Sequence, residues 1–211
     1  YLGNIRPRGS EISTGGHADG PIHYARMYDT VVDVCKQSEA RRGACAVYLP
    51  VEHQDIDEFL DIGTEGNPIQ NLQYGITVGD TWMEEMKEGD RKKRKIWAKI
   101  IQRRSEFGFP YIMFKDSSNN NSPYKELGME ITASNLCSEI QLPTDSYNSF
   151  VCCLGSINLL HWDQIKETDA IETYVYFLNA VMDEFIIKSE TMPGMKRAFN
   201  FAEKHRAIGL G

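Results

Sequence analysis

Three side chains that could do chemistry together stand at alternate positions of one short stretch: the carboxamide of Asn135, the thiol of Cys137 and the carboxylate of Glu139. In an extended segment, residues i, i+2 and i+4 point to the same side, so these groups are predicted to face one small volume. A carboxylate can exchange protons with a substrate, and an amide can hold an oxygen in place. Because apolar Ile140 and Leu142 follow, we predict a buried loop or strand. The alternative is a core cysteine beside two polar residues.

The stretch Ser-Asn-Leu-Cys-Ser-Glu-Ile at 134–140, with Leu-Pro shortly after it, resembles the finger-loop signature of the large (catalytic) subunit of class I ribonucleotide reductases. The resemblance implies that Cys137 carries a transient thiyl radical that takes the 3′-hydrogen of the ribose. It also implies that Glu139 acts as general base at the 3′-hydroxyl while Asn135 holds the 2′ and 3′ oxygens. The wording Asn-Leu-Cys favours class I over the cobalamin-dependent class II, in which Asn-Pro-Cys-Gly is more usual.

A second motif, Cys-Cys-Leu-Gly-Ser-Ile-Asn-Leu at 152–159, lies in a predicted buried strand over 149–159. It resembles the redox strand of the same family, which implies that Cys152 is one member of the dithiol that supplies the reducing electrons. Neighbouring side chains of a strand point to opposite faces, so Cys153 is predicted to pack in the core. A Cys-Cys pair in an apolar strand is usually core, but the two motifs in this order favour the reductase.

Two loops within residues 1–45 resemble the effector-specificity loops of the family. Gly-Asn-Ile-Arg at 3–6 resembles the start of the loop that binds effector phosphates, which makes Arg6 a candidate contact because its fork can hold phosphate oxygens bidentately. Residues 35–44 resemble the substrate-specificity loop, in which Gln37 and Arg41 would sense the bound deoxynucleotide. The chain departs from the bacterial pattern across residues 10–14, where a further Arg is missing. A plain surface loop is the alternative for residues 1–21.

The resemblance implies reduction of ribonucleoside diphosphates to 2′-deoxyribonucleoside diphosphates, which supplies precursors for DNA. The implied partners are a metal-containing small subunit that generates the radical, a second large subunit in a homodimer, and thioredoxin or glutaredoxin. ATP and deoxynucleoside triphosphates would act as effectors, and this segment would bind no cofactor of its own. Residue 1 is Tyr and the apolar run 207–211 ends the chain, so we expect an internal segment of a longer protein, inactive alone. The partner of Cys152 is expected upstream, and the radical-relay tyrosines downstream.

Other functions remain open at this point. A cysteine hydrolase could use Cys137 with a histidine, although no histidine neighbours it in the sequence. A non-catalytic nucleotide-binding module could be built on Arg6, Gln37 and Arg41. The cobalamin-dependent class II reductase is a third alternative. No metal site is predicted, because the five histidines are scattered and none stands in a Cys/His ligand spacing.

The composition fits an ordinary globular protein and excludes several classes. The chain has 211 residues, of which 41% are hydrophobic and 25% charged, and its net charge of −7 argues against direct nucleic-acid binding. The sequence contains no run of eighteen apolar residues, so no membrane helix is predicted, and no signal peptide is visible. Five cysteines without framework spacing indicate a reducing compartment, so we predict a cytoplasmic protein. The basic cluster 91–95 is interpreted as a solvated helix face.

The expected elements alternate between strand and helix, which predicts parallel βαβ units and an α/β fold. A loop at 1–21 is followed by a helix from Ile22, whose apolar stripe of Tyr24, Met27, Tyr28, Val31, Val34 and Cys35 is predicted to be core. Further helices are expected at 56–60, 81–107 (with Thr81 as a cap), 168–188 and 195–205, strands at 44–50, 74–78, 110–116, 149–159 and 207–211, and a turn at 117–123. The resemblance implies part of a ten-stranded barrel, built from two half-barrels, with the finger loop (131–143) at its centre. The sequence has no repeat and no clear domain boundary.

Overall fold

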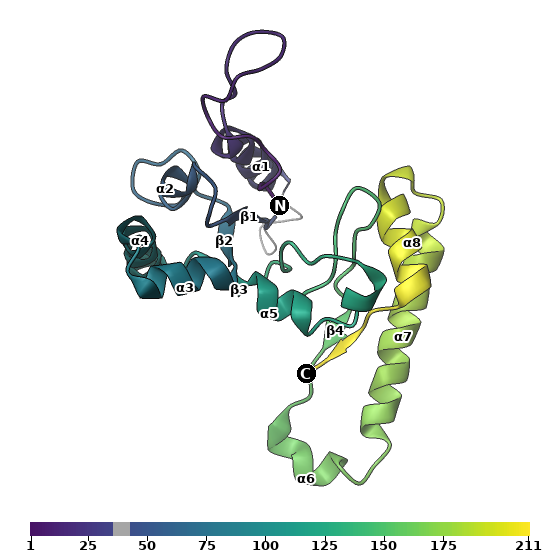
Figure 1. Cartoon of the computed structure of the whole chain (residues 1–211). Coiled ribbons are helices and arrows are strands. Elements are labelled where there is room, and N and C mark those ends of the chain that lie inside the picture. The colour runs from purple at the N-terminus through teal and green to yellow at the C-terminus, as the bar shows by residue number, and fades with distance from the viewer. Residues whose placement is uncertain (36–42) are drawn as a thin grey trace. The chain divides into compact units, whose positions relative to one another are not determined.

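The chain forms two compact units, residues Tyr1–Gln141 and Leu142–Gly211. The structure is a computed structural model that describes residues 1–35 and 43–211 (Figure 1). The boundary falls inside the stretch 131–143, where the sequence pattern gave no sign of a division. Each unit has its own hydrophobic core, so we describe each by itself.

The first unit is built on a three-stranded parallel sheet in the order β1-β2-β3. The strands are β1 (Ala46–Pro50), β2 (Gln73–Val78) and β3 (Tyr111–Phe114). Parallel neighbours need crossover connections, and helices α2 (Ile56–Phe59), α3 (Asp80–Glu88) and α4 (Arg91–Phe107) belong to them. The predicted parallel βαβ arrangement is therefore confirmed in this unit.

The main core of the first unit lies around β2, the central strand. Residues 74–78 of this strand are all buried, as expected for a strand covered on both faces. The ring of Tyr74 meets Phe59 of α2 edge to face, with 5.6 Å between the ring centroids. Ile76 and Ile100 of α4 are fully buried in the same cluster. This packing fixes the sheet against its crossover helices.

The helix predicted over 81–107 is broken into α3 and α4, because Gly89 and Asp90 end one helix and start the next. Gly89 has φ 120°, a conformation that residues with a side chain rarely adopt. The Asp90 carboxylate then caps α4 by accepting hydrogen bonds from the amides of Lys92 and Lys93. The N-cap of α3 is Gly79, so the predicted cap Thr81 lies inside the helix. The basic cluster that follows is largely exposed, as predicted.

Helix α1 (Pro21–Val34) forms where a helix was predicted, but it buries the opposite face. The residues of the predicted core stripe are exposed; they are Tyr24, Met27, Tyr28, Val31, Val34 and Cys35. Ile22, Ala25 and Val32 are buried instead. Asp29 holds this face inward, because its buried carboxylate accepts hydrogen bonds from the backbone amides of residues 70 and 71.

Helix α5 (Lys115–Asn120) replaces the turn predicted at 117–123. Its polar side chains form hydrogen bonds to backbone carbonyls, and the segment is helical rather than a turn. The Asn119 side chain donates to the carbonyl of Ile131 and accepts from its amide. From Asn121 to Val151 the chain has no strand and only the short 3-10 helix η1 (Lys125–Leu127).

The second unit contains the short parallel pair β4 (Leu154–Gly155) and β5 (Gly209–Leu210), and its helices lie between these two strands in the chain. These are η2 (Leu159–His161), α6 (Trp162–Ile165), α7 (Ala170–Ser189), η3 (Pro193–Met195) and α8 (Lys196–His205). Helices α7 and α8 lie side by side in Figure 1.

The strands predicted at 149–159 and 207–211 are much shorter than expected, because only two residues of each pair in a ladder. The two long helices were predicted correctly. Among the described residues, no helix combines the length and the apolar character needed to cross a membrane.

Candidate functional site

The stretch that carries Cys137 folds into a closed loop. The amide of Asn135 donates to the carbonyl of Ile140 at 3.0 Å, and the amide of Ile140 donates to Asn135 Oδ1 at 2.9 Å. Inside this ring the amide of Ser138 bonds to the carbonyl of Asn135, and Ser138 adopts φ 72°. The prediction of an extended segment with three side chains on one side is therefore wrong. The Asn135 side chain bends the backbone, as short polar side chains do in turns.

Burial within this loop also differs from the prediction. Cys137 and Glu139 are exposed, while Asn135 is half-buried. Asn135 and Ile140, at the two ends of the loop, bond to each other and close it. The thiol and the carboxylate therefore stand at its tip. The loop thus exposes a sulfur that could act as a nucleophile or a redox group and, two residues away, a carboxylate that could accept a proton.

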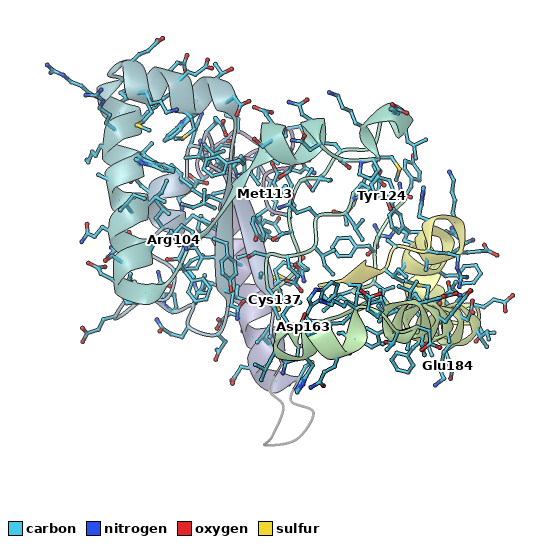
Figure 2. All side chains as sticks on the ribbon, turned by 90° about the horizontal axis from the view of Figure 1, so that it is seen from below. Arg104, Met113, Tyr124, Cys137, Asp163 and Glu184 are labelled. Carbon is cyan, nitrogen blue, oxygen red and sulfur yellow. The ribbon has the colours of Figure 1, made fainter. Side chains whose placement is uncertain are left out.

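A small second core ties the loop to the sheet. Ile131, just before the loop, is fully buried against Tyr48 of β1 and Met113 of β3. The hydroxyl of Tyr48 lies 2.5 Å from Ser134 Oγ, at the base of the loop. Figure 2 shows the side chains of this region, with Met113 and Cys137 labelled. The loop is therefore irregular in backbone but anchored at its base.

A cavity of about 280 Å³ adjoins the loop. Its wall is formed by Tyr48, Arg104, Tyr111, Ile112, Met113, Ser134, Ser138 and Gln141. Burial raises the pKa of Tyr111, and the neighbouring acidic groups of Tyr48 and Cys137 raise it further, against the opposing effect of Arg104. Ser138 Oγ is buried and has no hydrogen-bond partner among the described residues.

These lining residues were not singled out from the sequence. Ser134 belongs to the recognised motif, yet the motif gives it no role. Tyr48 looked like an ordinary strand residue. Only the fold brings β1, α4 and the loop to one cavity. In the sequence, the polar hydroxyl of Tyr48 within a buried strand was the one sign that this residue could take part in a site.

The two adjacent cysteines of the second unit differ as predicted. Cys152 is exposed, whereas Cys153 is 8% exposed and packs with Leu178 and Met182 of α7. The Cys153 sulfur is 3.5 Å from the carbonyl oxygen of Leu178, and burial raises the pKa of its thiol. Cys153 is thus a core residue, and Cys152 is the thiol of this pair that is open to reaction.

The N-terminal loop and the first turn of α1 line a cavity of about 500 Å³. Arg6 lies in its wall and donates a hydrogen bond to the carbonyl of Glu11 at 3.0 Å. The other arginine of the loop, Arg8, is paired with Glu58 at 2.7 Å. Two histidines, His17 and His23, share the cavity with Arg6 and were not predicted as site residues. This cavity combines the cationic Arg6, the acidic Asp19 and polar groups with apolar walls.

The other two predicted effector contacts, Gln37 and Arg41, lie outside the described residues. The described chain stops at the end of α1 and resumes just before β1. Within residues 1–35 and 43–211, no group of three or more His, Cys, Asp or Glu side chains is placed to hold a metal ion.

Known proteins resemble this chain over its whole length. A family model described as "Ribonucleotide reductase, barrel domain" matches residues 1–93 and 90–211. The structure of a class Id ribonucleotide reductase alpha subunit from Actinobacillus ureae matches with a TM-score of 0.91 and 51% sequence identity, covering 100% of this chain and 39% of that chain.

Two curated relatives widen the comparison. The ribonucleoside-diphosphate reductase large subunit of Invertebrate iridescent virus 3 is 30% identical over 91% of this chain and 42% of its own length. The vitamin B12-dependent ribonucleoside-diphosphate reductase of Mycobacterium tuberculosis is 32% identical over 99% of this chain and 32% of its own length. The chain therefore spans less than half of each relative. With all of its residues matched by the family model, the chain belongs to the ribonucleotide reductase family and is part of the barrel domain.

Proposed function

We propose that the complete protein is the large subunit of a class I ribonucleotide reductase, which converts ribonucleoside diphosphates to their 2′-deoxy forms. The observation that carries the proposal is the closed loop with Cys137 and Glu139 at its tip. The chain that bears it is 51% identical to a class Id alpha subunit. In the proposed complete protein, the loop reaches into the centre of a ten-stranded barrel.

The proposed chemistry begins at Cys137. A thiyl at its sulfur takes the hydrogen atom from C3′ of the ribose, which leaves a thiol and a carbon radical. Glu139 accepts the proton of the 3′-hydroxyl, as a carboxylate within reach can. Asn135 is proposed to hold the 2′ and 3′ oxygens through the N–H donors of its carboxamide, since its Oδ1 accepts the amide of Ile140. At the end of the cycle the hydrogen atom returns to C3′ and the thiyl is restored.

The reducing electrons are proposed to come from a dithiol that includes Cys152. The 2′-hydroxyl leaves as water after taking one proton from this dithiol, and the second proton and two electrons pass to C2′, which gains a C–H bond as the two sulfurs form a disulfide. Thioredoxin or glutaredoxin would then restore the dithiol. The exposure of Cys152 and the burial of Cys153 support this choice of sulfur.

The N-terminal cavity is proposed to take part in binding a nucleotide effector, ATP or a deoxynucleoside triphosphate. Arg6 in its wall supports this role, because a guanidinium suits phosphate oxygens. Gln37 and Arg41 remain proposed effector sensors on the basis of the motif alone.

Two protein partners are proposed. One is a metal-containing small subunit that supplies the radical. The other is a second large subunit, and the exposed apolar face of α1 supports it: five large apolar side chains stand at helical spacing on the outside of this helix, at residues 24, 27, 28, 31 and 34. Contiguous exposed apolar surface of this kind marks interaction sites.

A second candidate is a cobalamin-dependent reductase of class II. It is favoured by the vitamin B12-dependent relative from Mycobacterium tuberculosis. The same fold and cysteine pair would then use adenosylcobalamin, with no small subunit, as the source of the radical. The Asn-Leu-Cys motif and the class Id structural match favour class I.

The test is CDP reduction by the full-length large subunit, followed by chromatography of the product dCDP. We expect product only when the small subunit and a thioredoxin system are both added. Product formed with adenosylcobalamin and no small subunit would move the protein to class II. Effector binding without product under any of these conditions would favour the non-catalytic nucleotide-binding module.

A further inference from the structure

The loop that carries Cys137 is joined to the sheet by a chain of hydrogen bonds that starts at a buried tyrosine. Ser134 Oγ donates to the carbonyl of Asn135 at 3.1 Å. A serine hydroxyl has one hydrogen, so the Tyr48 hydroxyl, 2.5 Å away, is the donor to Ser134. The carbonyl of Asn135 also accepts the amide of Ser138, inside the ring that bears Cys137. The chain therefore ends on the backbone next to the thiol.

The tyrosine at the start of this chain is held in place from several sides. Tyr48 is 2% exposed and packs against Met113 and Ile131. Its ring lies directly over Gly75 of β2, where a Cβ atom would overlap the ring. The position of its hydroxyl is thus set by the sheet, by the glycine and by Ile131 at the start of the loop segment.

Because a cavity lies beside the loop, the hydrogen bonds between Tyr48, Ser134 and Asn135 contribute to the position of the loop. If the loop base were packed solidly, contacts alone would hold it. Here a space of about 280 Å³ borders both Ser134 and Ser138, so the loop has room to move toward the sheet. Ile131 anchors the start of the loop segment, and the hydroxyl chain from Tyr48 adds a second tie to the sheet at Ser134 and Asn135, beside the cavity.

We propose that Tyr48 and Ser134 are positioning residues that set the place of Cys137 and Glu139 for reaction. This inference rests on the proposed function and adds to it two residues that act through the backbone of the loop. Reacting groups must be held close to their productive geometry, and a shift of about 1 Å in a catalytic group can cost about 100-fold in rate. The pair acts through the backbone of Asn135, which both closes the loop and receives the hydrogen bond.

The test compares four variants of the full-length large subunit in CDP reduction with the small subunit. Tyr48→Phe keeps the ring and removes the donor. Ser134→Val removes the hydroxyl, and Ser134→Thr restores it in a side chain of nearly the same shape. The matched control is Tyr74→Phe, which removes the hydroxyl of a buried tyrosine on the next strand that has no hydrogen-bond partner among the described residues.

We expect kcat to fall about 10- to 100-fold in Tyr48→Phe and in Ser134→Val, the cost of a displaced reacting group. Ser134→Thr should recover most of the activity, and Tyr74→Phe should match the wild type. ATP affinity and the thermal midpoint should stay close to wild type in all four. The double variant Tyr48→Phe/Ser134→Val should be no slower than either single one, since both break one hydrogen-bonded chain.

Three results would overturn the inference. They are a kcat within about twofold of wild type in Tyr48→Phe and Ser134→Val, a Ser134→Thr variant as slow as Ser134→Val, or losses that multiply in the double variant. If Tyr48→Phe fails to fold, the Ser134 pair decides alone. An inactive wild type would instead mean that the proposed function is wrong, so the two failures are distinguishable.

Discussion

The three cysteines of the two motifs differ in their exposure to solvent. Cys137 and Cys152 are exposed, whereas Cys153 is buried and its thiol pKa is raised by burial. The thiolate is the reactive form. We therefore expect iodoacetamide at about pH 8 to label Cys137 and Cys152 faster than Cys153, because burial both shields the Cys153 sulfur from the reagent and lowers its thiolate fraction.

Peptide mass spectrometry over a time course measures these rates, and the urea-unfolded protein is the control in which the three cysteines should react alike. Labelling of native Cys153 at the rate of Cys152 would contradict the assignment of Cys153 to the core.

The sequence motif singles out Asn135, Cys137 and Glu139 as candidates, but it did not predict the geometry of the loop that carries them. The spacing of Asn135, Cys137 and Glu139 predicted an extended segment. Instead, the Asn135 carboxamide accepts the amide of Ile140 and closes the loop. Local side-chain bonds of this kind compete with extended structure, and nothing in the apolar pattern shows which will prevail. The roles of these residues in the reaction stay predictions.

At the scale of elements, the sheet depends on a glycine that accepts a neighbouring ring. Gly75 of β2 lies against the ring of Tyr48, and a Cβ atom there would overlap it. Gly75→Ala should therefore lower the free energy of unfolding by about 1–3 kcal/mol, the usual cost of overpacking. Urea denaturation measures the change. Gly194→Ala is the control, because open space surrounds that position, and an equal loss in both variants would contradict the packing described here.

A charge cluster ties α4 to the turn after α2. Burial acts to raise the pKa of Asp61, but hydrogen bonds from Arg103 (2.8 Å) and Lys99 outweigh it, so the pKa lies below its usual value. A lowered folded-state pKa gives stability that is fully present above the unfolded value of about 3.9 and is lost as pH falls through the folded one.

The prediction is that Asp61→Asn costs stability at neutral pH and that its difference from wild type shrinks below about pH 4, where the wild-type carboxyl becomes protonated. Urea midpoints between about pH 2.5 and 7, a range that includes the titration of a carboxyl group, measure this. A difference that stays constant with pH would show that the charge of Asp61 contributes nothing. The effect is expected to be modest, because Asp61 is partly exposed to solvent.

The order of strands and long helices could be predicted from periodicity, while two features of the elements could not. Helix α1 carries apolar residues on two faces, and the spacing alone does not say which face the sheet covers. The break between α3 and α4 depends on one glycine and one capping aspartate inside an otherwise continuous pattern. Both outcomes are decided by tertiary contacts and local capping.

For the whole molecule, the exposed face of α1 predicts self-association. Val31→Glu places a charge in the middle of the apolar stripe and should weaken the proposed large-subunit dimer at least about tenfold, or about 1.4 kcal/mol. Sedimentation equilibrium of the full-length protein measures the dissociation constant. Arg26→Glu is the control, since Arg26 is exposed on the same helix outside the stripe. Equal dissociation constants for Val31→Glu and wild type would contradict this role of α1.

The most direct test of the account is CDP reduction by the full-length Cys137→Ala variant with its small subunit, beside Cys152→Ser. Effector binding is checked in parallel to show that both variants are folded. The account predicts that Cys137→Ala forms no dCDP, even in a first turnover, because the thiyl cannot form without that sulfur. Cys152→Ser is predicted to lose multiple turnover, because the dithiol cannot supply its electrons. A Cys137→Ala variant that still makes dCDP would contradict the central claim.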